Sequence, residues 1–185
     1  MPGQTPSQTV GPFFSHALAP DHPSFRRVAA NRLAPPDASG PRIRIEGRVT
    51  DGAADPVPDA LLEVWQADPS GAYPDGSRPF RGFGRAATDG AGRYWFETLK
   101  PGPAAPGAAP HISLVVFARG LLNHVFTRIY FSDEGAANAA DELLADIGEE
   151  RRGTLIATLL ARRSRQTYRF DIRLRGERET VFLDA

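Results

Sequence analysis

Several residue types and patterns are missing from this chain of 185 residues, and each absence excludes a class of protein. There is no cysteine, which excludes disulfides, thiolate metal sites and cysteine nucleophiles. No apolar run approaches the roughly 18 to 20 residues that are needed to cross a bilayer. The 22 basic and 22 acidic residues balance, so no net charge attracts nucleic acid or an anionic membrane. We therefore expect neither nucleic acid nor a membrane as a partner.

The composition that remains is that of an ordinary globular protein. Hydrophobic residues make up 41% and charged residues 24% of the chain, which excludes a disordered or fibrous class. The first residues, Met1-Pro2-Gly3-Gln4-Thr5-Pro6, are polar and contain neither a basic stretch nor an apolar stretch. A secretory leader has both, so we expect none and assign the chain to the cytoplasm.

The common catalytic motifs are also missing. The four histidines are His16, His22, His111 and His124, and none of them forms a His-x-His or His-x-x-x-His pair. No glycine-rich phosphate loop precedes a helix, and there is no Gly-x-Ser-x-Gly elbow. A metal site assembled from distant residues stays open, but no spacing points to one. From its residues alone, the sequence has no self-contained catalytic constellation.

The pattern of apolar residues predicts mostly strands. Residues 1–41 are rich in proline and polar residues and have few periodic apolar positions, so we interpret them as an extended N-terminal arm. From Arg42 onward, apolar and polar residues alternate with the period of half-buried strands. Strands are expected at 42–49, 60–66, 93–99, 112–118, 125–131 and 167–174, with 180–183 closing the chain.

Glycine, proline and polar turns separate these strands. Residues 68–85 are expected to form a long loop, and 138–147 the one convincing helix. Residues 154–161 fit either a helix or a strand. The sequence thus predicts an all-β fold, an antiparallel β-sandwich at 42–185 preceded by the arm at 1–41 and carrying one short helix.

Three separated segments carry a resemblance to a known family. The first contains Glu-Val-Trp-Gln-Ala-Asp at 63–68 followed by Gly-Ala-Tyr at 71–73. The second runs from Gly-Arg at 84–85 to Lys-Pro-Gly-Pro at 100–103, and the third includes Ala-Pro-His-Ile at 109–112. Together they resemble the intradiol ring-cleaving dioxygenases, a β-sandwich family that holds Fe(III) with two tyrosinates and two histidines.

The resemblance implies that this chain has lost the iron site. Tyr73 stands at the position of the first tyrosine ligand and His111 at that of the first histidine. Ala104 stands where the second tyrosine belongs, and Ser113 replaces the second histidine. Both replaced groups are strong ligands for Fe(III). We therefore interpret Tyr73 and His111 as structural residues and expect Fe(III) to be bound by a partner chain.

This pattern of loss is similar to that of members of the family that pair two homologous subunits, of which only the beta subunit binds iron. The arm residues 5–14 and the segments 117–120, 154–157 and 168–173 resemble the iron-free subunit of such a pair. The resemblance implies a beta-subunit partner, a larger assembly of such pairs, and an active site shared between the two chains. Its substrates would be dioxygen and a carboxylated catechol.

Four residues are implied to border that shared site. Thr9, Gly11 and Pro12 match positions where the arm borders the substrate pocket, the alternative being a plain surface turn. Arg128 lies in an otherwise apolar strand, where a charge needs a partner. It matches an arginine near the substrate's entrance and suits a carboxylate. The alternative for Arg128 is an ion pair with an acidic residue of this chain or of the partner.

Two other interpretations compete with this one. A non-enzymatic β-sandwich module of the carboxypeptidase-regulatory or transthyretin type shares part of the strand-and-turn frame, but it leaves the segment at 63–68 and the arm unexplained. A homo-oligomeric intradiol enzyme, active alone, conflicts with Ala104 and Ser113 at the ligand positions.

Overall fold

The computed structural model describes residues 29–77, 79–162 and 166–184. Thr9, Gly11 and Pro12 lie outside the described residues, and the division into an arm at 1–41 and a sandwich at 42–185 stays a prediction. The strands are β1 Arg42–Thr50, β2 Leu61–Gln66, β3 Phe83–Ala87, β4 Arg93–Leu99, β5 His111–Phe117, β6 Val125–Phe131, β7 Ile156–Arg162, β8 Gln166–Arg169 and β9 Ile172–Arg173.

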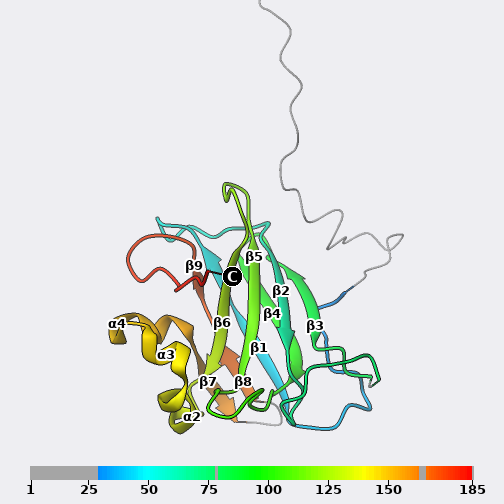
Figure 1. Cartoon of the computed structure of the whole chain (residues 1–185). Helices are drawn as coiled ribbons and strands as arrows, with labels where there is room; N and C mark the ends of the chain where they lie inside the picture. Colours follow the sequence, from blue (N-terminus) through cyan, green and yellow to red (C-terminus); the bar gives the residue numbers. More distant parts are fainter. Residues whose placement is uncertain (1–28, 78, 163–165, 185) are drawn as a thin grey trace, which may run out of the picture.

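The strands form two layers, which confirms the all-β sandwich (Figure 1). The strand order is β3-β2-β5-β6-β7-β8-β1-β4, with β9 also paired to β1. Most neighbours are antiparallel, as expected, but β1 runs parallel to β8 and β9, and β6 parallel to β7. A parallel pair needs a long crossover connection, and the chain between β6 and β7 provides one that contains the helices.

The described end of the arm lies between the two outermost strands. The backbone N–H of Arg85 in β3 donates to Ala30 O at 3.1 Å, while that of Glu97 in β4 donates to Asn31 O at 2.8 Å. Leu33 N in turn donates to Glu97 O at 2.8 Å, and the Leu33 side chain is buried. Exposed strand edges invite pairing with other chains, and this segment covers part of both edges.

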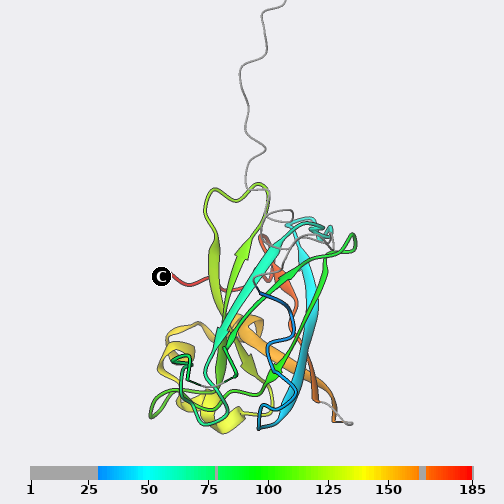
Figure 2. The same ribbon diagram turned by 90° about the vertical axis from the view of Figure 1, so that its right-hand side faces the viewer.

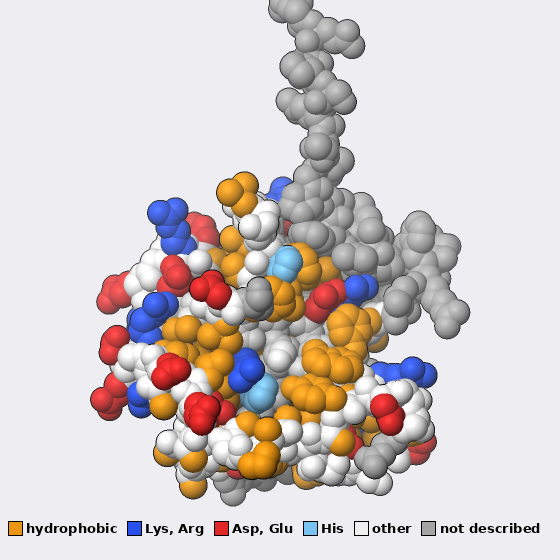
Figure 3. Space-filling model, viewed as in Figure 1, with side chains coloured by type: hydrophobic (Ala, Val, Ile, Leu, Met, Phe, Trp, Pro, Cys, Tyr) orange, Lys and Arg blue, Asp and Glu red, His pale blue; other side chains and the backbone are white. Residues whose placement is uncertain are grey.

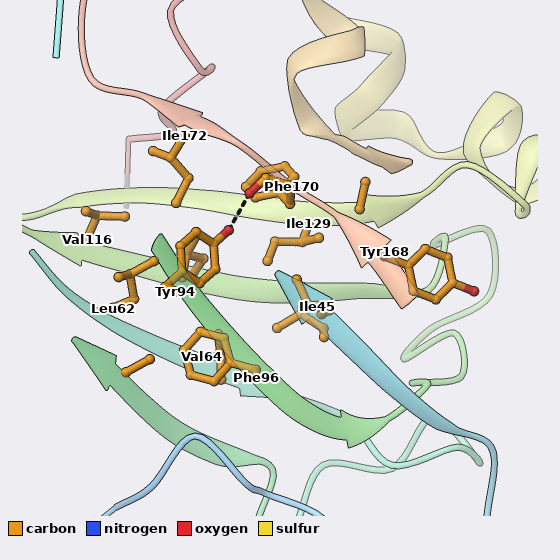
Figure 4. Packing of buried hydrophobic residues seen from close by; sticks show 14 of the residues in the cluster. Ile45, Leu62, Val64, Tyr94, Phe96, Val116, Ile129, Tyr168, Phe170 and Ile172 are labelled. Atoms are coloured by element: carbon orange, nitrogen blue, oxygen red, sulfur yellow. Dashed lines mark hydrogen bonds between the residues drawn. The ribbon is translucent and has the colours of Figure 1, made fainter. Parts of the chain in front are cut away.

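The core lies between the layers and is built from alternate positions of the strands (Figure 4). Ile45 from one layer and Leu62, Val64 and Ile129 from the other are almost completely buried. Tyr94 belongs to β4, and its hydroxyl donates at 2.6 Å to Phe170 O, which follows β8 on the other side of β1; this bond is the dashed line in Figure 4. Burial raises the pKa of Tyr94 well above its ordinary value, so the hydroxyl stays a donor.

The helix expected at 138–147 is not continuous, which corrects the sequence prediction. Helix α2 spans Gly135–Ala140, α3 spans Glu142–Asp146, and α4 spans Glu149–Arg152. Between the first two, Asp141 has extended backbone angles, and its carboxylate accepts a hydrogen bond from Leu144 N at 3.1 Å. Aspartate is a favoured N-cap residue, so Asp141 starts a new helix. All three helices lie beside one end of the sandwich (Figure 2).

In three further segments, the observed secondary structure differs from the prediction or decides between the predicted alternatives. The strand β3 begins inside the segment expected to be a loop, and the strand expected at 167–174 is divided into β8 and β9. Residues 153–155 form a short 3-10 helix that leads into β7, so the open choice at 154–161 falls mainly to a strand. Across the described ranges, no helix is long and apolar enough to cross a membrane.

Candidate functional site

The sequence-predicted site residues that the structure describes lie on or beside the outer face of the β3-β2-β5-β6 layer. Ile112 and Leu114 in β5 are buried in the core, so Ser113 between them faces outward. The strand register places Ser113 opposite Trp65 of β2 on one side and opposite Arg128 of β6 on the other. Trp65, Ser113 and Arg128 therefore form one row across three strands.

Tyr73 follows β2 and stacks on this row. Its ring lies 5.8 Å from that of Trp65, with 12° between the planes. The two side chains are among the few large hydrophobic residues that stay exposed, at 43% and 39%. Figure 3 shows hydrophobic side chains spread over the face formed by β2, β3, β5 and β6. The Tyr73 phenol is therefore part of an apolar surface.

The loop that carries Ala104 is fixed against the loop that carries Tyr73. Asp68 organises the first part of this contact, because its carboxylate accepts hydrogen bonds from Ser70 N at 2.8 Å and Ala72 N at 3.1 Å. Gly102 N donates to Asp68 O at 2.9 Å. Positions 73 and 104, which the family resemblance assigns to the two tyrosine ligands, thus belong to neighbouring loops, and only Tyr73 has a side-chain atom that could bind a metal.

His111 begins β5 and is buried. Its Nδ1 lies 2.9 Å from Ala109 O, and its ring packs against that of Tyr130, with 5.6 Å between the centroids. Burial lowers the pKa of His111 below its ordinary value, and the nearby charge of Arg128 acts in the same direction. His111 is therefore a buried, neutral imidazole.

A hydrogen-bonded chain connects Arg128 to the helix region. Arg128 Nη1 lies 3.4 Å from the Tyr130 hydroxyl, which lies 3.2 Å from Asp141 Oδ1. Burial raises the pKa of Tyr130 to about 12, so the phenol stays protonated. Among the residues described, no carboxylate forms a salt bridge with Arg128. Within the described part of this chain, the alternative of an ion pair for Arg128 finds no acidic partner, and the polar neighbour of Arg128 is Tyr130.

Asp141 is the anchor of this chain. Its carboxylate is buried and accepts hydrogen bonds from Ala109 N at 2.8 Å, from Leu144 N at 3.1 Å and from Tyr130. Burial acts to raise the pKa of Asp141, but these hydrogen bonds act in the opposite direction and prevail, so its pKa lies below the ordinary 3.8. One carboxylate thereby fixes α3, the entry to β5 and the Tyr130 ring.

The lowered pKa of Asp141 predicts a pH-dependent contribution to stability. A carboxyl whose pKa falls on folding stabilises the fold above its unfolded pKa, and this stabilisation is lost as the pH falls through the folded value. We expect Asp141→Asn to lower the free energy of unfolding by about 1 to 3 kcal/mol at pH 7, and by less at pH 3. Thermal unfolding of both proteins across this range measures the gap, and a gap independent of pH would contradict the assignment.

The residues at the four positions that the family resemblance assigns to iron ligands do not fit a ferric site. Ala104 has no donor, Ser113 supplies only a neutral hydroxyl, and Tyr73 is stacked on Trp65. In the described part of the chain, no group of three histidine, aspartate or glutamate side chains could hold a metal ion. The donor set that remains, one phenol and one imidazole, is half of the set that the resemblance implies.

Comparison with known proteins places the chain in a family. Residues 10–176 match the dioxygenase family, and the chain belongs to it, within its intradiol group. The chain is 45% identical to the protocatechuate 3,4-dioxygenase alpha chain of Burkholderia cepacia over 98% of both chains. It is also 45% identical to that of Pseudomonas putida, over 98% of this chain and 96% of the relative. It is thus homologous to these alpha chains over nearly their whole length.

A beta chain and a solved structure are more distant relatives. The protocatechuate 3,4-dioxygenase beta chain of Burkholderia cepacia is 34% identical, over 76% of this chain and 67% of the relative. The dioxygenase domain of a carbohydrate-binding fusion from Streptomyces sp. SirexAA-E superposes with a TM-score of 0.67 at 25% identity, over 95% and 100% of the two chains. These matches confirm the family and the fold, and they leave the transthyretin-type interpretation without support.

Sequence reasoning missed two residues of the site, Tyr130 and Asp141. Tyr130 is two positions after Arg128 in the same strand, so the alternation of a strand places both side chains on one face. Asp141 directly precedes Glu-Leu-Leu, where an aspartate can cap a helix. Both signals were present, but the hydrogen bond that joins the two residues depends on the tertiary structure.

Proposed function

We propose that this chain is the iron-free alpha subunit of a protocatechuate 3,4-dioxygenase of bacterial aromatic catabolism, in the beta-ketoadipate pathway. The main support is the combination of similarity to alpha chains with the loss of residues that could bind iron. The chain is alpha-like along nearly its whole length, yet Ala104 and Ser113 remove two of the four iron ligands. A homologue that keeps the fold and loses the metal needs a second chain to be active.

The proposed reaction opens the ring of protocatechuate with dioxygen. The bond between the two hydroxyl-bearing carbons breaks and both oxygen atoms enter the product, 3-carboxy-cis,cis-muconate. Fe(III), which the beta subunit would hold, would activate the catechol toward attack by dioxygen. The alpha subunit contributes the shape of the pocket, the exclusion of water and a positive charge.

The outer face of the β3-β2-β5-β6 layer is the surface that we assign to the beta subunit. It combines the exposed stack of Trp65 and Tyr73 with the half-buried Phe83, Val115 and Phe126. Aromatic residues on one side of a sheet, rimmed by polar groups, are typical of protein interfaces. The site residue Arg128 lies on the same face, so a partner docked there would bring its substrate within reach.

Within this interface, Arg128 is proposed to bind the substrate carboxylate, and Thr9, Gly11 and Pro12 to border the pocket. A guanidinium carries five donors and suits a planar carboxylate. The absence of a salt bridge to Arg128 within the described residues supports its availability. Glycine and proline in the arm permit close backbone approach and a fixed φ.

The complex can be tested by reconstitution. We expect the chain expressed alone to show no protocatechuate cleavage, and co-expression with an iron-binding beta homologue to give an active complex that elutes as one species in size-exclusion chromatography. Consumption of dioxygen measures the activity. A beta homologue that is equally active without this chain and does not co-elute with it would contradict the proposed partnership.

A further inference from the structure

The head group of Arg128 has a defined neighbour. Its side chain is half-buried on β6, and Tyr130 lies two residues further along the same face, with 3.4 Å between Nη1 and the phenolic oxygen. Across the strand, the position opposite Arg128 is Ser113, which has the smallest side chain of that row. Of these groups, the hydroxyl of Tyr130 is the one within reach of the guanidinium.

The direction of the hydrogen bonds is fixed by chemistry. Asp141 is ionised near neutral pH and can only accept, so the Tyr130 hydroxyl donates to its Oδ1 at 3.2 Å. The oxygen of Tyr130 is then free to accept from Arg128, which can only donate. The order of donation is Arg128 to Tyr130 to Asp141, and no tautomer or flipped side chain can reverse it.

Both supporting residues are held rigidly. The Tyr130 side chain is fully buried and packs on the ring of His111, while Asp141 is fixed by Ala109 N and Leu144 N. The phenolic oxygen is therefore a fixed point rather than one end of a mobile side chain. The hydrogen bond to this fixed oxygen orders the Arg128 side chain before an anion binds, so that binding costs less conformational entropy.

This arrangement differs from a direct ion pair in one important respect. A carboxylate in contact with Arg128 would occupy the same donors that a substrate carboxylate needs. Here the carboxylate of Asp141 does not touch Arg128, because the neutral phenol of Tyr130 lies between them and is hydrogen-bonded to both. One guanidinium donor is used for orientation, and the others stay available.

We propose that Tyr130, held by Asp141, is a positioning residue that sets the Arg128 guanidinium for the substrate carboxylate and so contributes to the selection of carboxylated over uncarboxylated catechols. This inference rests on the proposed function, in which Arg128 meets that carboxylate. It assigns to the alpha subunit a specificity element built from two residues of one strand and the helix cap behind them.

Tyr130→Phe in the complex with the beta subunit tests the proposal, because it removes only the hydroxyl. We expect KM for protocatechuate to rise about 3- to 10-fold with kcat unchanged, since a contact made equally in ground state and transition state acts on KM. The kinetics of catechol, which has no carboxylate, should not change. If this variant does not assemble, Asp141→Asn is measured instead. It should lower the ratio of kcat/KM for protocatechuate to kcat/KM for catechol, as Tyr130→Phe is expected to do.

The matched control is Tyr168→Phe, which removes the hydroxyl of another fully buried tyrosine whose hydroxyl bonds to an aspartate, Asp133, at 3.0 Å. It should leave the ratio between the substrates unchanged. In an Arg128→Ala background, Tyr130→Phe should have no further effect on this ratio.

Two results separate the inference from the function on which it rests. Equal losses for both substrates in Tyr130→Phe, or an effect on the ratio that persists without Arg128, would overturn the positioning role while leaving the role of Arg128 intact. A ratio unchanged in Arg128→Ala itself would instead overturn the role of Arg128, and the inference with it.

Discussion

Replacing Arg128 by alanine in the complex with the beta subunit is expected to lower kcat/KM for protocatechuate by about 10- to 150-fold. This range corresponds to the loss of a charge-assisted hydrogen bond worth about 1.5 to 3 kcal/mol. Catechol should be affected much less, because it lacks the carboxylate that Arg128 is proposed to bind. Steady-state kinetics with both substrates on the same preparation measure the difference.

The comparison of substrates distinguishes binding from structural support. An arginine that only stabilised the fold or the interface would, when removed, reduce the activity toward both substrates alike. Arg128→Lys serves as an intermediate control, since it keeps the charge and loses the planar fork, and should recover part of the activity toward protocatechuate. Equal losses for the two substrates, or no loss for either, would remove Arg128 from the substrate site.

Replacing Gly47 by alanine is expected to lower the free energy of unfolding by about 3 kcal/mol or more. A Cβ at this position of β1 would lie 1.8 Å from Phe170 O and 2.6 Å from its carbonyl carbon. That peptide has little freedom to move away, because Phe170 N donates to Glu46 O at 2.9 Å and Phe170 O accepts from Tyr94. Thermal or denaturant unfolding of the purified protein measures the loss.

Gly90→Ala is the matched control for this substitution. Gly90 lies in the turn before β4, and a Cβ there would meet no atom within 4 Å. We expect its free energy of unfolding to stay within about 0.5 kcal/mol of the wild type. If Gly47→Ala and Gly90→Ala were equally stable, the close approach of β1 to the segment after β8 would not exist.

The sequence was sufficient to predict most strands of the sandwich, and local physics explains why. Alternation places Ile43 and Ile45 inside and their polar neighbours outside, and the structure shows both isoleucines fully buried. The same alternation passes through Gly47 without indicating its role. That role comes from the backbone of Phe170, a residue more than a hundred positions away, which no local pattern contains.

Other elements were hidden by the same limitation. Strand β3 contains Gly84 and three consecutive residues, Arg85 to Ala87, of modest strand propensity, so its pairing with β2 rather than its composition makes it a strand. The apolar spacing of Leu143, Leu144 and Ile147 marked a buried side correctly, but the cap at Asp141 divided the helix. Periodicity reports which side of an element is buried and not where its hydrogen bonds begin.

For the candidate site too, some residues could be predicted from the sequence and others could not. Tyr73, Ala104, His111 and Ser113 were located by resemblance to the family; the structure places Tyr73 and Ser113 beside Trp65 on one outer face, joins the loop of Ala104 to that of Tyr73, and buries His111. Arg128 was singled out because a charge in an apolar strand needs a partner. The partner found within the described residues is Tyr130. Its role could not be predicted from the sequence, because its hydroxyl is held by Asp141, which lies outside the strand.

Iron analysis of the isolated chain tests the central claim most directly. The account predicts that the chain, expressed and purified alone in the presence of iron, holds no stoichiometric metal and lacks the visible absorption of tyrosinate bound to Fe(III). The co-expressed complex should hold one iron for each alpha-beta pair. One tightly bound iron per isolated chain would contradict the account, because Tyr73 and His111 would then suffice where we infer that Ala104 and Ser113 have removed the site.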